Sequence, residues 1–123
     1  MKIFYTKEHG CVKIDGEQGT IGISAYAAEQ LGDITYVDLP EAGDEIAKGE
    51  TFCSVESVKA ASDIYGPVTG IVTAVNEELM EAPEVMNESP EDEGLILKVE
   101  ITDTEEEGLL TPEEYDAYLE TID

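Results

Sequence analysis

The stretch at residues 55–64 decides the fold, and it reads Val-Glu-Ser-Val-Lys-Ala-Ala-Ser-Asp-Ile. Apolar and polar residues alternate on both sides of Lys59, which predicts two short strands over residues 51–56 and 61–65. A turn cluster at residues 65–70, Tyr-Gly-Pro-Val-Thr-Gly, ends the second strand, because glycine and proline interrupt regular pairing. The pattern therefore places Lys59 at the tip of a β-hairpin.

Lys59 is conspicuous because cations are scarce: the chain has 6 Lys and Arg residues against 30 Asp and Glu residues. A hairpin tip exposes its side chain and holds its backbone in one geometry. That suits a modifying enzyme that must recognise a folded surface, and it suits a tethered group that moves between partners. We therefore hypothesise that Lys59 is a modification site. A solvated turn lysine with no further role is the alternative that the residue pattern alone leaves open.

Length and composition predict a single domain, residues 1–123, with 41% hydrophobic residues, as expected of a globular protein. The formal net charge of −24 disfavours binding to nucleic acid or to anionic membranes. It favours solubility and encounters with basic patches on partner proteins, although a solvated acidic surface without a specific target is also compatible. Neither a membrane span nor a signal-peptide core is visible, so we expect a cytoplasmic protein.

The rest of the chain continues the same mainly β pattern. Asp15 and Gly16 form a turn signal between two alternating apolar runs and predict a first hairpin. Ser24 is a good helix N-cap, residues 25–31 are mostly helix formers and Gly32 is a stop signal, so a short helix follows. Strands are expected at residues 12–14, 20–23, 34–37, 71–75 and 95–101.

Two further segments complete the order of elements. Residues 76–94 are strongly acidic and contain two prolines, and we expect a loop there. Thr111 as N-cap and Pro112 at the first helical position predict a C-terminal helix. Its apolar residues fall at helical spacing and should pack on the body as one stripe: Tyr115, Tyr118, Leu119 and Ile122. Many short strands with peripheral helices indicate a small barrel or sandwich.

The two cysteines are too few for a disulfide framework. Cys53 shares a strand face with Val55, which predicts a buried thiol. A metal site built from His9, Cys11 and Cys53 is disfavoured, because neither pairing has the spacing of zinc ligands. With one histidine, no nucleophile elbow and no phosphate loop, the sequence gives little support to an enzyme in its own right.

Residues 56–63, Glu-Ser-Val-Lys-Ala-Ala-Ser-Asp, resemble the lipoylation signature of the H protein family of the glycine cleavage system. The resemblance covers nearly the whole chain. Biotin carriers usually place methionines beside the modified lysine, whereas Val58 and Ala60 stand here, so biotin is disfavoured. Further matching segments lie at residues 5–9, 20–23, 31–34, 37–43, 67–70, 75–79 and 83–87.

The resemblance implies a mainly β fold, a flattened barrel-sandwich hybrid of the lipoyl/biotinyl type. A short helix follows its first hairpin and a second helix ends the chain. It also implies lipoate as the cofactor, bound covalently as lipoyl-lysine at Lys59. A lipoate ligase or lipoyl transferase would recognise the residues around this attachment point: Glu56, Ser57, Val58, Ala60 and Asp63.

The function that the resemblance implies is that of a non-catalytic shuttle. Glycine decarboxylase (the P protein) would load a methylamine group from glycine onto the lipoyl arm. Aminomethyltransferase (the T protein) would take the one-carbon unit, and dihydrolipoyl dehydrogenase (the L protein) would reoxidise the arm. The alternatives are a relay that donates lipoyl groups to other 2-oxoacid dehydrogenase complexes, or an unmodified interaction domain of the same fold.

Four positions depart from the family pattern. Family members commonly have glutamate and tryptophan after the first histidine, where Gly10 and Cys11 follow His9 here. Many have histidine at the position of Tyr26 and tryptophan at the position of Leu95. The first two regions line the cleft that shelters the loaded arm in the family, so we expect the cleft of this chain to differ. We interpret Leu95 as a repacked core position.

Overall fold

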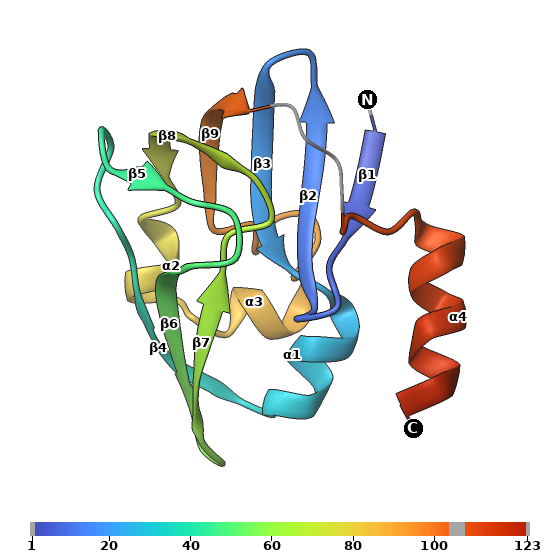
Figure 1. Cartoon of the computed structure of the whole chain (residues 1–123). Helices are drawn as coiled ribbons and strands as arrows, with labels where there is room; N and C mark the ends of the chain where they lie inside the picture. The colour runs from blue at the N-terminus through green and yellow to red at the C-terminus, as the bar shows by residue number, and fades with distance from the viewer. Residues whose placement is uncertain (1, 104–107, 123) are drawn as a thin grey trace.

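The computed structural model describes residues 2–103 and 108–122, and it consists mainly of β-strands in two sheets (Figure 1). The larger sheet has the strand order β1-β2-β3-β9-β8-β5 and the smaller has β4-β6-β7, with every neighbouring pair antiparallel. The fold class expected from the sequence is confirmed. The strands are β1 (Lys2–Tyr5), β2 (Gly10–Asp15), β3 (Gln18–Ile23), β4 (Ile34–Asp38), β5 (Glu45–Ile46), β6 (Thr51–Ser57), β7 (Ala61–Tyr65), β8 (Thr69–Val75) and β9 (Leu97–Asp103).

The helices lie around the sheets: α1 (Ala25–Leu31), α2 (Glu78–Glu81), α3 (Val85–Glu88) and α4 (Pro112–Ile122). The expected caps of α1 are present, since the Ala27 N–H donates to Ser24 Oγ and Gly32 ends the helix at φ 75°. At the start of α4, the Glu114 N–H donates to Thr111 Oγ1 and the Thr111 N–H donates to Glu114 Oε1. This reciprocal pair is a capping box. Thr111 is its N-cap residue, as the sequence predicted.

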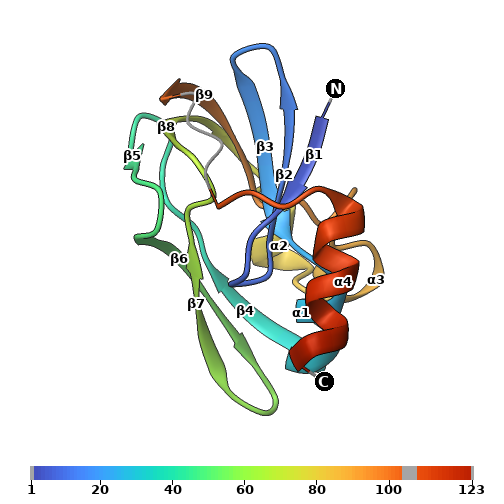
Figure 2. The same ribbon diagram turned by 45° about the vertical axis from the view of Figure 1, so that its right-hand side comes forward.

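The hydrophobic core fills the space between the two sheets, whose arrangement Figure 2 shows from a second side. Along the central strands the inward-facing side chains are mostly apolar and buried, while their neighbours face outward, as strand geometry requires. The smaller sheet contributes Val37, Cys53, Val55 and Ile64, and the larger contributes Val12, Ile21, Val72 and Val99. Burying each of the larger aliphatic side chains stabilises the fold by about 1.5–3 kcal/mol relative to exposure.

The expectation of a loop at residues 76–94 is wrong in part, because the short helices α2 and α3 lie within it. Each is a single turn, which leaves almost no helical periodicity to detect. What holds them is tertiary burial, since Leu79 and Met86 are both fully buried in the core.

Other differences concern element ends. Two strands of the structure, β1 and β5, are absent from the sequence-based expectation. β1 is an edge strand that pairs only with β2, and β5 has only two residues, so neither shows a clear alternating pattern. The last strand begins at Leu97 rather than Leu95. In α4, Tyr115 is buried and Tyr118 and Leu119 are half-buried, but Ile122 is 41% exposed, so the packed stripe is shorter than expected. The helix extends past the sheet edge that it covers (Figure 2).

At Gly70, where β8 meets β9, the neighbouring backbone leaves no room for a side chain. A Cβ atom built there would collide with the carbonyl oxygen of Glu100 and lie 3.2 Å from Ile101 Cα. Both are backbone atoms of a central strand, so neither can move without disturbing the pairing of β9 with β3. Only glycine fits this position.

We predict that Gly70→Ala lowers the free energy of unfolding by about 2–3 kcal/mol or more, because overpacking against fixed backbone is relieved only by shifting a strand. The matched control is Ile71→Ala, the next residue, whose side chain is 38% exposed and whose truncation should cost less than about 1 kcal/mol. Urea unfolding followed by circular dichroism measures both. Equal stability of the two variants would contradict the close-approach argument.

Candidate functional site

The tip of the β6–β7 hairpin is a four-residue turn, residues 57–60, that begins where Glu56 pairs with Ala61. Ser57 organises it: the Ser57 N–H donates to the Ala60 carbonyl oxygen over 2.8 Å. The Ser57 hydroxyl oxygen accepts from the backbone N–H groups of Lys59 and Ala60, each over 3.2 Å, and donates to the Ala60 carbonyl oxygen over 3.1 Å. Four hydrogen bonds therefore fix the backbone on which Lys59 stands.

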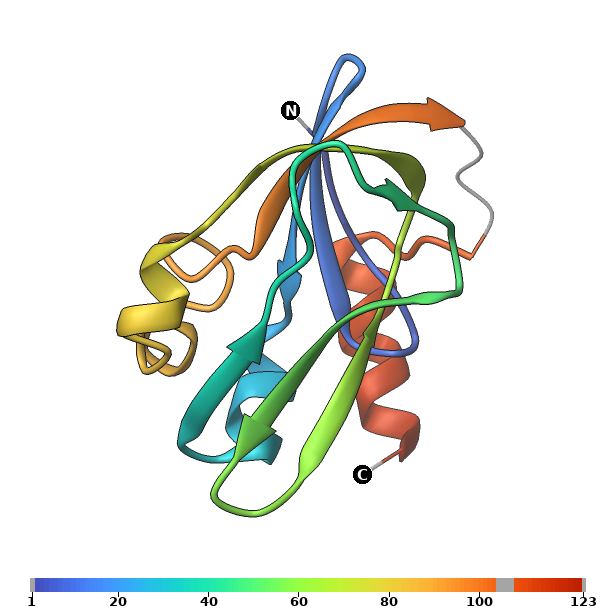
Figure 3. The same cartoon turned by 90° about the vertical axis from the view of Figure 1, so that its left-hand side faces the viewer.

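A second contact ties the tip to the rest of the protein. The Val58 N–H donates to the carbonyl oxygen of Asp33, which lies in the connection between α1 and β4, over 3.0 Å. Figure 3 shows this connection beside the hairpin tip. The Lys59 stem lies against Gly32, the residue that follows α1, because a Cβ built on Gly32 would be 3.1 Å from Lys59 Cε. Gly32 also has φ 75°, so glycine suits this position on two grounds.

The Lys59 amine is exposed, and within residues 2–103 and 108–122 no carboxylate forms an ion pair with it. Val58 beside it is 67% exposed, and Ala60 is also exposed. Glu56 and Asp63 lie on the outer face of the hairpin, since Glu56 pairs with Ala61 and Asp63 with Ser54. The residues predicted for the attachment region therefore lie together around the tip, with Ser57 as its internal support.

A cleft of about 250 Å³ lies beside the hairpin. Its walls come from the turn before β2, from β3 and α1, and from strand β7. Two of the four positions that depart from the family pattern, Gly10 and Tyr26, are in this lining. Its residues are Glu8, His9, Gly10, Ile23, Tyr26, Ala27, Gln30, Leu31, Ser62, Asp63 and Ile64.

His9 stands at the junction of this cleft with α4. Its backbone has φ 69°, a conformation that histidine tolerates better than most side chains. Its Nδ1 lies 2.8 Å from the Tyr115 hydroxyl, which lies 2.7 Å from Ser24 Oγ, and its ring centroid lies 4.7 Å from that of Tyr26. If the Ser24 hydroxyl donates to the Tyr115 oxygen and the Tyr115 hydroxyl donates to His9 Nδ1, both hydroxyl hydrogens have an acceptor. The imidazole hydrogen of neutral His9 is then on Nε2. Burial lowers the pKa of His9 more than nearby Glu8 raises it.

The same aromatic cluster fastens α4 to the sheet. The rings of Tyr5 and Tyr115 are stacked, with centroids 4.5 Å apart and an interplanar angle of 7°. The Tyr5 hydroxyl donates to Glu91, whose other carboxylate oxygen accepts from the Ala25 N–H over 2.7 Å. Burial, followed by the hydrogen bond to Glu91, raises the pKa of Tyr5. One wall of the cleft is therefore held by residues from five separate segments.

The remaining sequence-predicted positions carry no reactive group. Burial raises the pKa of the Cys11 and Cys53 thiols to about 12, so both stay protonated at neutral pH. Among the described residues, no cluster of His, Cys, Asp and Glu side chains has the arrangement of a metal site. Leu95 packs on β3, because a Cβ built on Gly22 would lie 2.9 Å from Leu95 Cδ2.

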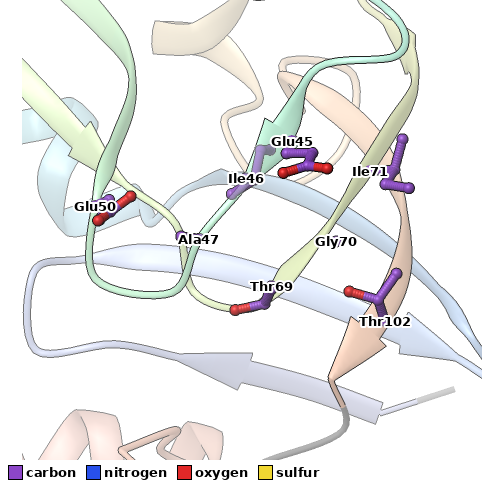
Figure 4. A pocket seen from close by; sticks show the side chains of 8 residues that line it. All are labelled: Glu45, Ile46, Ala47, Glu50, Thr69, Gly70, Ile71 and Thr102. Atoms are coloured by element: carbon purple, nitrogen blue, oxygen red, sulfur yellow. The ribbon is translucent and has the colours of Figure 1, made fainter.

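Another pocket lies between the β5 segment, β8 and the end of β9 (Figure 4). Two carboxylates and two threonine hydroxyls line it together with aliphatic side chains. Neither Lys59 nor the cleft residues contribute to it, so it is separate from the hairpin site. Its lining is Glu45, Ile46, Ala47, Glu50, Thr69, Gly70, Ile71 and Thr102.

The fold and the tip define the class of protein: a carrier domain of the lipoyl/biotinyl type, with two small sheets and a lysine on the tip of an exposed hairpin. No helix in the described ranges is both long and apolar enough to cross a bilayer.

Comparisons with known proteins narrow this class. The family model described as glycine cleavage H-protein matches residues 3–122. The glycine cleavage system H protein of Carboxydothermus hydrogenoformans is 50% identical over 117 residues, which are 94% of this chain and 90% of that protein. The H protein of Halothermothrix orenii is 46% identical over 122 residues, which are 98% of this chain and 95% of that protein.

A crystal structure of a glycine cleavage system H protein from Mycobacterium marinum superposes with a TM-score of 0.89 at 32% sequence identity, covering 97% of both chains. This chain belongs to the glycine cleavage H-protein family. It is therefore a non-catalytic carrier component of the glycine cleavage system, as the sequence predicted.

Sequence reasoning missed the connection at Gly32 and Asp33 as part of the site. The family resemblance included these residues, but no local signal says that they contact the tip. The contact joins residues about 25 positions apart, so it exists only in the folded chain.

We predict that His9 titrates below the ordinary histidine pKa of about 6.5, because burial penalises the imidazolium. Folding then favours the neutral form, so the His9 contribution to stability is complete above about pH 6.5 and is lost as pH falls through the folded pKa. His9 is the only histidine in the chain, so one imidazole signal followed by NMR gives its pKa directly. The urea-unfolded protein is the reference, and a folded pKa at or above that reference would contradict the prediction.

Proposed function

We propose that Lys59 is the covalent attachment point of a lipoyl group, and that the chain, as one domain of residues 1–123, shuttles the methylamine group of glycine. One observation carries the assignment: in a member of this family, the signature lysine stands exposed on a tip whose backbone is fixed on both sides. A fixed backbone presents the amine to a modifying enzyme in one geometry. Because the side chain is exposed and pairs with no carboxylate of the described residues, it can still extend away from the surface.

The residues present fit a lipoyl group. When bound, the lipoyl group supplies a disulfide that can be reduced and reoxidised and can carry a one-carbon amine. The protein holds the amide end of the arm at the tip and supplies the surface from which the arm reaches its partners. Cys11 and Cys53 are buried with raised pKa values, so neither thiol would compete in disulfide exchange.

The cleft beside the hairpin is where we propose that the arm rests between partners. Its lining near β7 includes Ser62, whose side chain shares the inward face of the hairpin with Val55. On the α1 side, the ring of Tyr26 lies next to His9. Gly10 contributes no side chain where many family members have a glutamate. An aromatic face and a hydroxyl oxygen both suit a protonated amine, so Tyr26 and Ser62 would shelter it in this chain.

The partners that we propose follow from the same assignment. They are glycine decarboxylase, aminomethyltransferase and dihydrolipoyl dehydrogenase for the shuttle, and a lipoate ligase or lipoyl transferase for attachment. Glu56, Val58, Ala60 and Asp63 form the exposed surface around the lysine that an attaching enzyme would contact. The cytoplasmic location expected from the sequence stays a prediction.

We predict that a lipoate ligase, with ATP and lipoate, adds the mass of one lipoyl group to the wild-type protein and nothing to Lys59→Arg. Arginine keeps the charge but offers no acylable amine at neutral pH. Lys98→Arg, on the exposed face of β9, is the matched control and should be modified like the wild type. Intact-mass spectrometry reads the result, and an adduct that survives Lys59→Arg would refute the site.

We predict that the fully lipoylated protein supports glycine decarboxylation when combined with the P, T and L proteins, and that the unmodified protein does not. NADH formation measures turnover of the complete cycle. A lipoylated sample that the L protein reduces and reoxidises, but that supports no glycine-dependent NADH formation, would sink the shuttle and leave the lipoyl relay as the better explanation.

A further inference from the structure

Asn87, at the end of α3, makes two hydrogen bonds to one stretch of backbone. Its Nδ2 donates to the carbonyl oxygen of Gly32 over 2.6 Å, and its Oδ1 accepts from the N–H of Ile34 over 2.8 Å. One carbonyl and one N–H are the two partners, so the orientation of the amide group follows from chemistry. The side chain therefore pairs with residues 32 and 34 much as a neighbouring strand would.

The stretch that Asn87 hydrogen-bonds, residues 32–34, is also the stretch that contacts the hairpin tip. Asp33, between the two gripped residues, accepts the hydrogen bond from the Val58 N–H through its carbonyl oxygen over 3.0 Å. Gly32 is the residue against which the Lys59 stem lies. A continuous path therefore runs from α3 to the tip: the Asn87 amide, the backbone of residues 32–34, and then the backbone of Val58.

The helix that carries Asn87, α3, is itself held in place by packing. Met86, the neighbour of Asn87, is fully buried in the hydrophobic core and holds α3 in place, and α1 packs against α3. Without Asn87, residues 32 and 34 would lose these two hydrogen bonds, while Ile34 would keep its pairing with Ser57 and its burial in the core. Gly32 has φ 75°, and glycine adopts positive and negative φ about equally readily, so sterics alone do not hold the backbone there.

We propose that Asn87 is a positioning residue for Lys59: its amide holds the connection at residues 32–34 and thereby fixes the hairpin tip in the geometry that the attaching enzyme accepts. The inference rests on the proposed role of Lys59 as the attachment site. The asparagine itself touches neither the lysine nor the cofactor. It acts on the modification reaction by setting the fraction of molecules whose tip is correctly docked.

The first measurement uses the unmodified protein and follows hydrogen exchange at the Val58 amide by NMR. In Asn87→Ala both partners of that amide, Val58 and Asp33, are chemically unchanged, so faster exchange reports looser docking alone. Asn87→Ala removes two neutral hydrogen bonds. Their combined net contribution to docking corresponds to about tenfold faster exchange of the Val58 amide. Asn87→Asp keeps an acceptor for Ile34 but has no donor for Gly32, and it should also exchange faster than the wild type.

The matched control is Asn76→Ala. Asn76 also donates twice from Nδ2 to backbone carbonyls, those of Glu93 and Leu95, over 3.1 and 2.9 Å, but on a segment that does not contact the tip. It should lose stability comparably and leave Val58 exchange as in the wild type. If Asn76→Ala accelerates Val58 exchange as much as Asn87→Ala does, the effect is general loosening and the proposal is overturned.

The second measurement is the steady-state rate of lipoate attachment with the unmodified protein as the varied substrate. A smaller docked fraction raises the apparent KM for the protein in inverse proportion and leaves kcat nearly unchanged. We expect the KM of Asn87→Ala to rise by the ratio of the docked fractions of wild type and variant, at most about tenfold, and the KM of Asn76→Ala not to rise. An unchanged KM, or a fall in kcat alone, overturns the proposal. Failure of the wild type to be modified would instead overturn the assignment of Lys59, and the exchange result would still decide whether Asn87 fixes the tip.

Discussion

The register of β6 is the constraint on which the rest of this structure depends. β6 is the central strand of the smaller sheet and pairs with β4 on one side and β7 on the other. Val55 points into the core with no exposed surface, and Glu56 points outward, so a slip of one residue would exchange the two faces. Because the apolar face must be buried, the turn has to fall at residues 57–60, and Lys59 has to stand at the tip.

Fixing the turn is not the same as fixing the tip in space. β4 pairs with β6 only as far as Ser57, so the turn beyond it needs further support from outside the hairpin. That support comes from the connection between α1 and β4, which contributes the carbonyl of Asp33 and the small surface of Gly32. The carrier function needs both properties together: a backbone that an enzyme recognises as one shape, and a side chain that leaves the surface.

The cleft beside the hairpin is built from residues that lie far apart in the sequence. Its wall next to α4 is a cluster in which Tyr5, His9, Ser24 and Tyr115 satisfy one another, so the C-terminal helix is part of the site although it lies far from Lys59 in sequence. Two of the four departures from the family pattern, Gly10 and Tyr26, line this cleft, and the tip itself retains the family signature. The tip and the cleft are therefore built from different residues, so the proposed attachment and the proposed shelter of the arm can be tested separately.

The sequence by itself determined the mainly β class, the hairpin around Lys59, the caps of α1 and α4 and the buried thiol of Cys53, because each depends on neighbours within a few positions. Only the tertiary structure decided that α2 and α3 form, since one-turn helices persist only when residues such as Leu79 and Met86 are buried. It also decided the path from Asn87 to the tip and the placement of His9 against Tyr115. These contacts join segments separated by tens of residues, and hydrogen bonds over such distances leave no periodic trace in the sequence.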